Sequence, residues 1–125
     1  MEDKKTILIV EDEKSISGAL SDKLNNEGYT ILQAKNGEEG LKIALKEHPD
    51  LMLVDILMPK MDGIKMAKEL RKDIWGKTAK IIILTNVTDL NQVQEVMDSE
   101  VFEYLTKSNV TLEYLTNKVK DFLNR

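Results

Sequence analysis

Short apolar runs alternate along this chain with longer segments in which apolar residues recur every three or four positions. Short runs rich in β-branched residues are typical of strands, and the longer spacing is typical of amphipathic helices. The pattern predicts strands at Thr6–Val10, Thr30–Gln33, Leu51–Val54, Lys80–Thr85 and Glu103–Thr106. It predicts helices at Ser15–Asn26, Gly37–Glu47, Asp62–Arg71, Thr88–Asp98 and Thr111–Leu123.

Three of the predicted strands are apolar at every position rather than at alternate positions: Ile7–Val10, Leu51–Val54 and Ile81–Leu84. A strand without a polar face is buried on both sides, as in a parallel sheet covered by helices on each face. Right-handed crossovers between such strands place helices on both faces. We therefore expect an α/β fold, a doubly wound five-stranded parallel sheet, in one domain spanning residues 1–125.

Composition and charge exclude several classes of protein. The chain has 125 residues, a net charge of −4 and a pI of about 5.1, which argues against direct binding to nucleic acid through a basic face. No apolar stretch approaches the roughly 20 residues of a membrane span. The charged start, Met1–Thr6, lacks the apolar segment of a signal peptide. The absence of cysteine excludes disulfides and thiolate metal sites. We expect a cytoplasmic protein with no membrane partner.

Polar residues stand at the ends of four predicted strands. Glu11 and Asp12 follow the first strand, Asp55 follows the third, Thr85 ends the fourth and Lys107 follows the fifth. The carboxyl ends of parallel strands meet at one edge, where ligands bind in open α/β sheets. Each residue alone has an ordinary structural explanation: a helix start, a turn, a strand residue or a surface lysine. Their convergence at one edge favours a functional site.

The charges at this edge point to phosphoryl transfer with a metal ion. Three nearby carboxylates repel one another, and a hard divalent cation removes that repulsion. Oxygen-only ligands suit Mg²⁺, which would also neutralise a phosphoryl group arriving at Asp55. Lys107 could pair with one phosphoryl oxygen, and the Thr85 hydroxyl could donate a hydrogen bond to another. This is the set of groups required for transfer onto a carboxylate nucleophile.

The motifs at these positions resemble the receiver domain of two-component response regulators over essentially the whole chain. They are Ile7–Glu13, Asp55–Gly63, Ile83–Thr85 and Tyr104–Lys107, in this order and spacing. The resemblance is to single-domain members such as the chemotaxis response regulator. It implies a flavodoxin-like (βα)5 fold with strand order 2-1-3-4-5. It also implies a signalling protein rather than an enzyme, one that catalyses only its own aspartyl phosphorylation and slow dephosphorylation.

The resemblance implies a set of metal ligands around the phosphoacceptor. Asp55 receives the phosphoryl group and also ligates Mg²⁺. Asp12 ligates the ion directly, and Glu11 helps through a water molecule. The backbone carbonyl of Leu57 supplies a further ligand.

The resemblance also implies how the phosphoryl group is bound and detected. Thr85, Lys107 and the backbone N–H of Asn86 bind it. Tyr104 is an aromatic switch that moves inward when Thr85 is drawn toward the phosphate. The donor is a phosphohistidine on a sensor histidine kinase or a histidine phosphotransfer protein. The fourth helix, fifth strand and fifth helix form the face that binds a downstream protein, which the sequence does not identify.

Three positions depart from the family pattern. Asn86 stands where a small residue is usual, which leaves the lifetime of the phosphorylated state open. Ser108 stands where Pro is usual, and we expect a trans Lys107–Ser108 bond because a non-proline cis bond costs roughly 2.5–4 kcal/mol. Glu100-Val101 replaces the Gly-Ala pair that usually ends the fourth helix, which could alter partner choice.

Other functions compete with the phosphorylated switch. A Mg²⁺-dependent aspartyl phosphohydrolase, similar to the haloacid dehalogenase family, needs a second Asp two residues after the nucleophile as general acid. Leu57 occupies that position, which counts against turnover of small substrates. A phosphorelay intermediate, a phosphate sink or an interaction scaffold stays open. We expect no output domain after Arg125, and therefore no direct transcriptional role.

Overall fold

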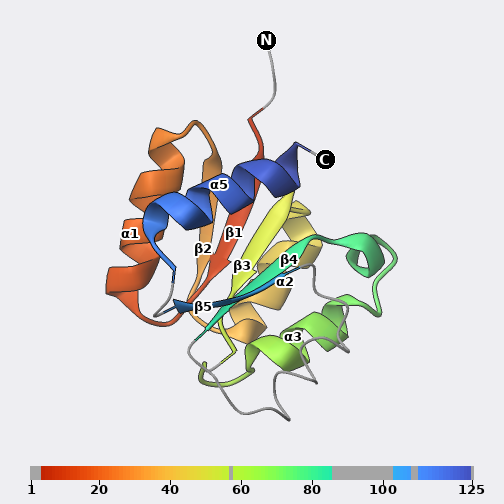
Figure 1. Ribbon diagram of the computed structural model, residues 1–125. Helices are drawn as coiled ribbons and strands as arrows, with labels where there is room; N and C mark the ends of the chain where they lie inside the picture. Colours follow the sequence, from red (N-terminus) through yellow and green to blue (C-terminus); the bar gives the residue numbers. More distant parts are fainter. Residues whose placement is uncertain (1–3, 57, 86–102, 108–109, 125) are drawn as a thin grey trace.

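Five parallel strands form a single sheet with the order β2-β1-β3-β4-β5. The computed structural model describes residues 4–56, 58–85, 103–107 and 110–124, and at residues 103 and 104 it describes the backbone alone. The strands are β1 (Thr6–Val10), β2 (Thr30–Ala34), β3 (Leu51–Val54), β4 (Ile81–Thr85) and β5 (Glu103–Thr106). The predicted parallel sheet and its strand order are confirmed (Figure 1).

Two pairs of helices cover the two faces of the sheet, with α1 and α5 on one side and α2 and α3 on the other (Figure 1). The described α-helices are α1 (Lys14–Asn26), α2 (Gly37–Glu47), α3 (Gly63–Leu70) and α5 (Leu112–Leu123). Thr111 and Asp62, at which the sequence predicted two of the helices to start, are N-caps whose side chains accept the N–H groups of Tyr114 and Lys65. The predicted helix Thr88–Asp98 lies outside the described residues. Among the described helices, none has the length and apolar character needed to cross a bilayer.

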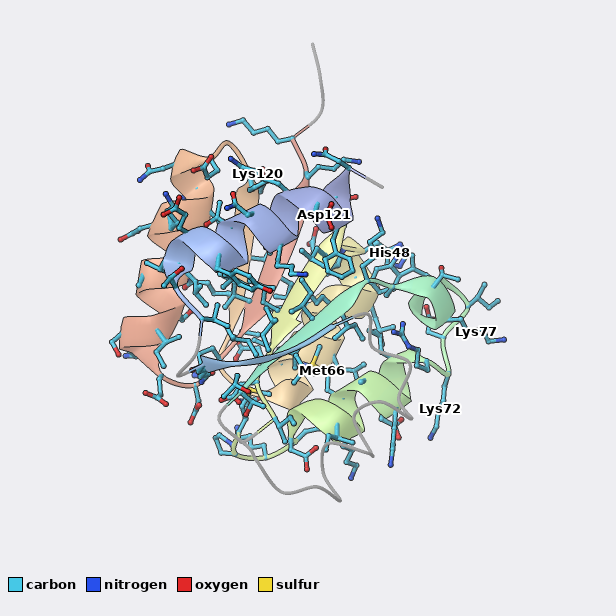
Figure 2. All side chains as sticks on the ribbon, viewed as in Figure 1. His48, Met66, Lys72, Lys77, Lys120 and Asp121 are labelled. Carbon is cyan, nitrogen blue, oxygen red and sulfur yellow. The ribbon has the colours of Figure 1, made fainter. Side chains whose placement is uncertain are left out.

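The buried strands send alternate side chains into two apolar layers. One layer, against α2 and α3, contains Leu8, Val10, Met52, Val54, Ile81 and Ile83. The other, against α1 and α5, contains Ile7, Ile9, Leu51, Leu53, Ile82 and Leu84. Met66 of α3 extends into the first layer and is 1% exposed (Figure 2). Each such side chain stabilises the fold by roughly 1.5–3 kcal/mol, so the sheet supports a rigid edge for the polar residues at its strand ends.

The connection before β4 contains a 3₁₀ helix, η1 (Trp75–Thr78), which the sequence did not predict. The Asp73 carboxylate accepts the N–H groups of Trp75 at 3.0 Å and Gly76 at 3.2 Å. The Trp75 ring stacks on His48 with the ring centroids 4.4 Å apart. His48 ends α2 as an exposed residue with φ of 48°, and lies on the outer edge of the molecule (Figure 2). Trp75 thus packs this loop at the end of the sheet opposite the predicted site.

Candidate functional site

The strand register places Glu11 beside Asp55 at the carboxyl edge of the sheet. Val10 pairs with Val54 in the β1–β3 ladder, so the residues that follow them are neighbours. The Asp55 N–H donates to the Val10 carbonyl at 3.1 Å, and the Glu11 N–H donates to the Ala34 carbonyl at 3.0 Å. These bonds continue the two ladders past the strand ends, and they fix the backbone of both acidic residues.

An acidic cluster of Glu11, Asp12 and Asp55 forms at this edge. One carboxylate oxygen from each residue lies within 4.8 Å of the other two. Glu11 and Asp55 are each 5% exposed, whereas Asp12 is exposed. The cluster is therefore buried on one side and accessible from solvent on the other. These are the three side chains that the sequence predicted as metal ligands, and the structure brings them together.

Lys107 extends into the acidic cluster from the end of β5. Its Nζ lies 2.5 Å from Glu11 Oε1 and 3.0 Å from Asp55 Oδ2, and its side chain is 11% exposed. Burial alone would lower the pKa of Lys107, but its hydrogen bonds to both carboxylates and their negative charges outweigh that effect. The pKa of Lys107 is therefore raised above its ordinary value. The side chain is a cation at neutral pH and neutralises part of the cluster.

Burial raises the pKa of the Glu11 carboxyl to about 7. The hydrogen bond from Lys107 opposes the rise, while the neighbouring Asp55 carboxylate adds to it. Without a further cation, the Glu11 carboxyl therefore holds a proton part of the time at neutral pH. A metal ion that binds here would compete with that proton, since both require the same lone pairs.

Two buried carboxylate oxygens in the cluster, Glu11 Oε2 and Asp55 Oδ1, have no hydrogen-bond partner among the described residues. Leaving a buried polar atom unpaired costs about 1–3 kcal/mol, so such atoms are uncommon. Lys107 uses the other oxygen of each carboxylate. The two oxygens that Lys107 does not bind, together with the exposed Asp12 carboxylate of the same cluster, offer a donor set for a hard cation, and the residues present therefore fit Mg²⁺.

The structure places the other predicted site residues to different extents. Thr85 ends β4, is 1% exposed, and pairs with Thr106 in the β4–β5 ladder. Tyr104 lies in β5, but its side chain is outside the described part of the chain. Predictions for Leu57, Asn86, Glu100, Val101 and Ser108, including the trans Lys107–Ser108 bond, also fall outside the described residues and stay predictions.

An apolar pocket of about 270 Å³ opens beside the acidic cluster, between α1 and the start of α5. Its lining includes Ile16 and Ala19 of α1, Leu84 of β4, and Leu112 of α5. Lys107 also lines this pocket and is therefore shared with the cluster. Sequence reasoning missed it, because apolar residues on α1 and α5 were assigned to the core. The available signal was that Ala19 stands beside the main apolar stripe of α1; in the structure Ala19 and Leu112 are both exposed.

Comparison with known sequences gives a consistent result. A family model described as "Response regulator receiver domain" matches residues 7–120. The sporulation initiation phosphotransferase F of Bacillus subtilis (strain 168) is 34% identical over 117 residues, covering 94% of this chain and 92% of that protein. The DNA-binding dual master transcriptional regulator RpaA of Synechocystis sp. is 36% identical over 122 residues, covering 95% of this chain and 49% of the regulator. The chain spans half or less of the transcriptional regulators that it matches.

Comparison with solved structures extends the likeness to the fold. A response regulator receiver domain protein (CheY-like) from Methanospirillum hungatei JF-1 has a TM-score of 0.91 and 29% identity, covering 98% of this chain and 95% of that one. The chemotaxis protein CheY4 of Vibrio cholerae has a TM-score of 0.87 and 28% identity, covering 96% and 99%. The predicted flavodoxin-like architecture is thereby confirmed.

Proposed function

This chain belongs to the response regulator receiver domain family, and from that premise we propose that it is a phosphorylation-dependent switch with Asp55 as phosphoacceptor. One observation carries the proposal: Glu11, Asp12 and Asp55 gather within 4.8 Å at the sheet edge, with Lys107 bound to two of them. A carboxylate in such a site can act as a nucleophile toward phosphorus, because adjacent cations neutralise the charge of both reactants.

In the proposed reaction, an Asp55 carboxylate oxygen attacks the phosphorus of a phosphohistidine on the donor. A P–O bond forms, the P–N bond breaks, and the imidazole leaves with the bonding electron pair. Lys107 exchanges its contact with Asp55 for one with a phosphoryl oxygen. The Thr85 hydroxyl and the Asn86 backbone N–H donate to the remaining oxygens, as the family resemblance implies.

Glu11, Asp12 and Asp55, with the backbone carbonyl of Leu57, would hold Mg²⁺ in this proposal. When bound, the ion supplies positive charge between the carboxylates and the incoming phosphoryl group. Support comes from the unpaired Glu11 Oε2 and Asp55 Oδ1 and from the raised pKa of Glu11. Among the described residues, Lys107 is the one cation paired with the two buried carboxylates, so this part of the site has an excess of negative charge.

The proposed donor is a sensor histidine kinase or a histidine phosphotransfer protein. The apolar pocket lined by Ile16, Ala19 and Leu84 shares Lys107 with the acidic cluster. Apolar side chains of the donor that bound there would hold its phosphohistidine next to Asp55. Phosphorylation would then act through Thr85 and Tyr104 on the face formed by β5, α5 and the predicted fourth helix, which binds a downstream protein.

A place in a phosphorelay is the second candidate function. It is favoured by a relative named as a phosphotransferase, which matches this chain over 92% of its own length. In that case, the phosphoryl group on Asp55 passes to another histidine instead of changing a binding face. The phosphohydrolase alternative is not favoured, because Leu57 stands where its general acid is required.

Phosphorylation by a small donor tests the proposal directly. Acetyl phosphate with Mg²⁺ is expected to add one phosphoryl group to the protein, detected by intact-protein mass spectrometry. Chelation of the metal ion or the substitution Asp55→Asn should remove the added mass, with the same unfolding transition as evidence of an intact fold. A folded wild-type protein that neither acquires the group nor binds Mg²⁺ would exclude this function.

A further inference from the structure

The first residue of α2, Gly37, contacts the loop that follows Asp55. Its N–H donates to the carbonyl of Met61 at 2.9 Å. A Cβ at Gly37 would lie 2.2 Å from the same carbonyl oxygen, far inside the 3.0 Å that real Cβ contacts respect. Only glycine allows α2 to approach this loop so closely without a shift of the backbone.

Gly63, which follows Met61 by two residues, lies equally close to the backbone of Asp55, the proposed phosphoacceptor. A Cβ there would lie 2.1 Å from the backbone carbonyl oxygen of Asp55. The Gly63 N–H donates to the carbonyl of Ile56 at 3.0 Å and closes the loop on the strand end. Met61, Asp62 and Gly63 therefore form a continuous connection from Gly37 to the backbone of Asp55.

Local hydrogen bonds limit how far residues 61–63 can adjust when Met61 is displaced. The Met61 N–H donates to the carbonyl of Pro59 at 2.8 Å, and Asp62 Oδ1 accepts the Lys65 N–H at 2.8 Å. Lys60 has φ of 67°, a left-handed conformation that few residues other than glycine adopt. A shift of Met61 is therefore passed along the backbone toward Gly63 and Asp55.

We propose that Gly37 is a positioning residue for the Asp55 site, although it touches none of the acidic side chains. It sets how closely the loop after β3 lies against α2, and through Gly63 it sets the position of the Asp55 carboxylate relative to Glu11 and Lys107. The inference rests on the proposed function, since it assumes that Mg²⁺ binds at this cluster. Displacement of supporting groups typically weakens metal binding by roughly 10–100-fold.

The test is the Mg²⁺ dissociation constant of Gly37→Ala, measured by isothermal titration calorimetry. We expect weakening of about tenfold or more. The matched control is Gly40→Ala on the same helix, for which the three nearest atoms to an added Cβ are side-chain atoms outside the loop, the two Val10 methyl groups at 2.9 Å and Met66 Sδ at 3.1 Å. Gly40→Ala should lose stability with little change in Mg²⁺ affinity. The amide resonance of Gly63 in the metal-free protein should move in Gly37→Ala.

If Gly37→Ala does not fold, a second pair of variants tests the same inference. Asp62→Ala removes the bond to the Lys65 N–H and loosens the loop without adding an atom. Asp62→Asn removes the same charge but keeps an N-cap acceptor. We expect Asp62→Ala, and not Asp62→Asn, to weaken Mg²⁺ binding several-fold.

The possible results separate this inference from the proposed function. Wild-type affinity in Gly37→Ala, or equal weakening in Gly37→Ala and Gly40→Ala, would overturn the positioning role alone. Equal affinities in the two Asp62 variants would count against it in the same way. A wild-type protein without Mg²⁺ binding would overturn the proposed function and this inference together.

Discussion

Lys107 and Glu11 stand 96 positions apart in the sequence, and the Lys107 Nζ lies 2.5 Å from Glu11 Oε1. The same ammonium group binds Asp55 Oδ2 at 3.0 Å, so one cation joins the ends of β1, β3 and β5. Glu11 and Asp55 are almost excluded from water. Their charges therefore depend on Lys107 whenever no other cation is bound. Lys107 stabilises the metal-free site in addition to its proposed contact with the phosphoryl group.

Replacing Lys107 with methionine is expected to lower the free energy of unfolding of the metal-free protein by about 3–5 kcal/mol, because two buried carboxylates lose their partner. Mg²⁺ should restore part of that loss, since it supplies the missing charge. Urea unfolding with and without Mg²⁺ measures both effects. The control is Lys72→Met, which removes an exposed 3.0 Å ion pair with Glu69 and should change stability by less than about 1 kcal/mol. Similar small losses in both variants would contradict this role of Lys107.

The contribution of Glu11 to the stability of the metal-free protein is expected to fall as the pH rises from 4.5 to about 7. The pKa of Glu11 is about 7 in the folded state and 4.5 in the unfolded chain, so between these values the folded state keeps a proton that the unfolded state has released. The contribution of Glu11 is complete below this interval and lost above it, with a total of up to about 3 kcal/mol. Glu11→Gln, which cannot titrate, should lack this component. The free energy of unfolding of both proteins is measured in urea at a series of pH values. If the wild type and Glu11→Gln show the same dependence on pH, this contribution of Glu11 is ruled out.

The sheet and the meeting of its strand-end residues could be predicted because both depend on pattern alone. Strands that are apolar at every position must be buried on both faces, which leaves a parallel sheet between helices. Once the strands are parallel, their carboxyl ends share one edge, and the residues directly after them, Glu11, Asp55 and Lys107, lie at that edge. No detail of side-chain torsion is required for that step.

The contacts within the site and the η1 loop could not be predicted, because they depend on side-chain geometry. Spacing does not indicate which carboxylate oxygens Lys107 binds, nor that Asp55 Oδ1 is buried without a described partner. The η1 turn is fixed by the Asp73 carboxylate and by stacking of Trp75 on His48, a residue distant in the sequence. Neither contact has a periodic signature.

Donor docking can be separated from chemistry by changing the wall of the apolar pocket. Ala19→Arg places a long charged side chain at the wall of the pocket, on an exposed position of α1 that is not part of the acidic cluster. Transfer from the cognate phosphohistidine donor should slow by about tenfold or more, since a desolvated charge at an interface costs several kcal/mol. Phosphorylation by acetyl phosphate should stay unchanged.

The control for this effect is Asn25→Arg, which adds the same side chain to an exposed position of α1 that does not line the pocket. It should leave both reactions unchanged. If Ala19→Arg slows acetyl phosphate as much as the protein donor, the pocket affects the chemistry and not the docking. If Asn25→Arg slows the protein donor equally, net charge and not the pocket is responsible.

Two glycines are expected to respond to the same substitution with opposite sign. A Cβ at Gly76 would lie 1.9 Å from the Leu70 carbonyl oxygen, so Gly76→Ala forces the η1 turn to shift and should lower the free energy of unfolding by about 1–3 kcal/mol. A Cβ at Gly18, inside α1, has no atom within 4 Å outside its own helix backbone and chain neighbours, and Gly18→Ala should raise stability by about 0.5–1 kcal/mol through helix propensity.

The fluorescence of Trp75, the single tryptophan, gives a second measurement. Trp75 adjoins Gly76 and stacks on His48, so its emission in the folded state should change in Gly76→Ala alone. A loss of stability in both variants would mean that α1 packs against a neighbour at Gly18, and unchanged stability in Gly76→Ala would mean that the loop can move away from Leu70 at little cost.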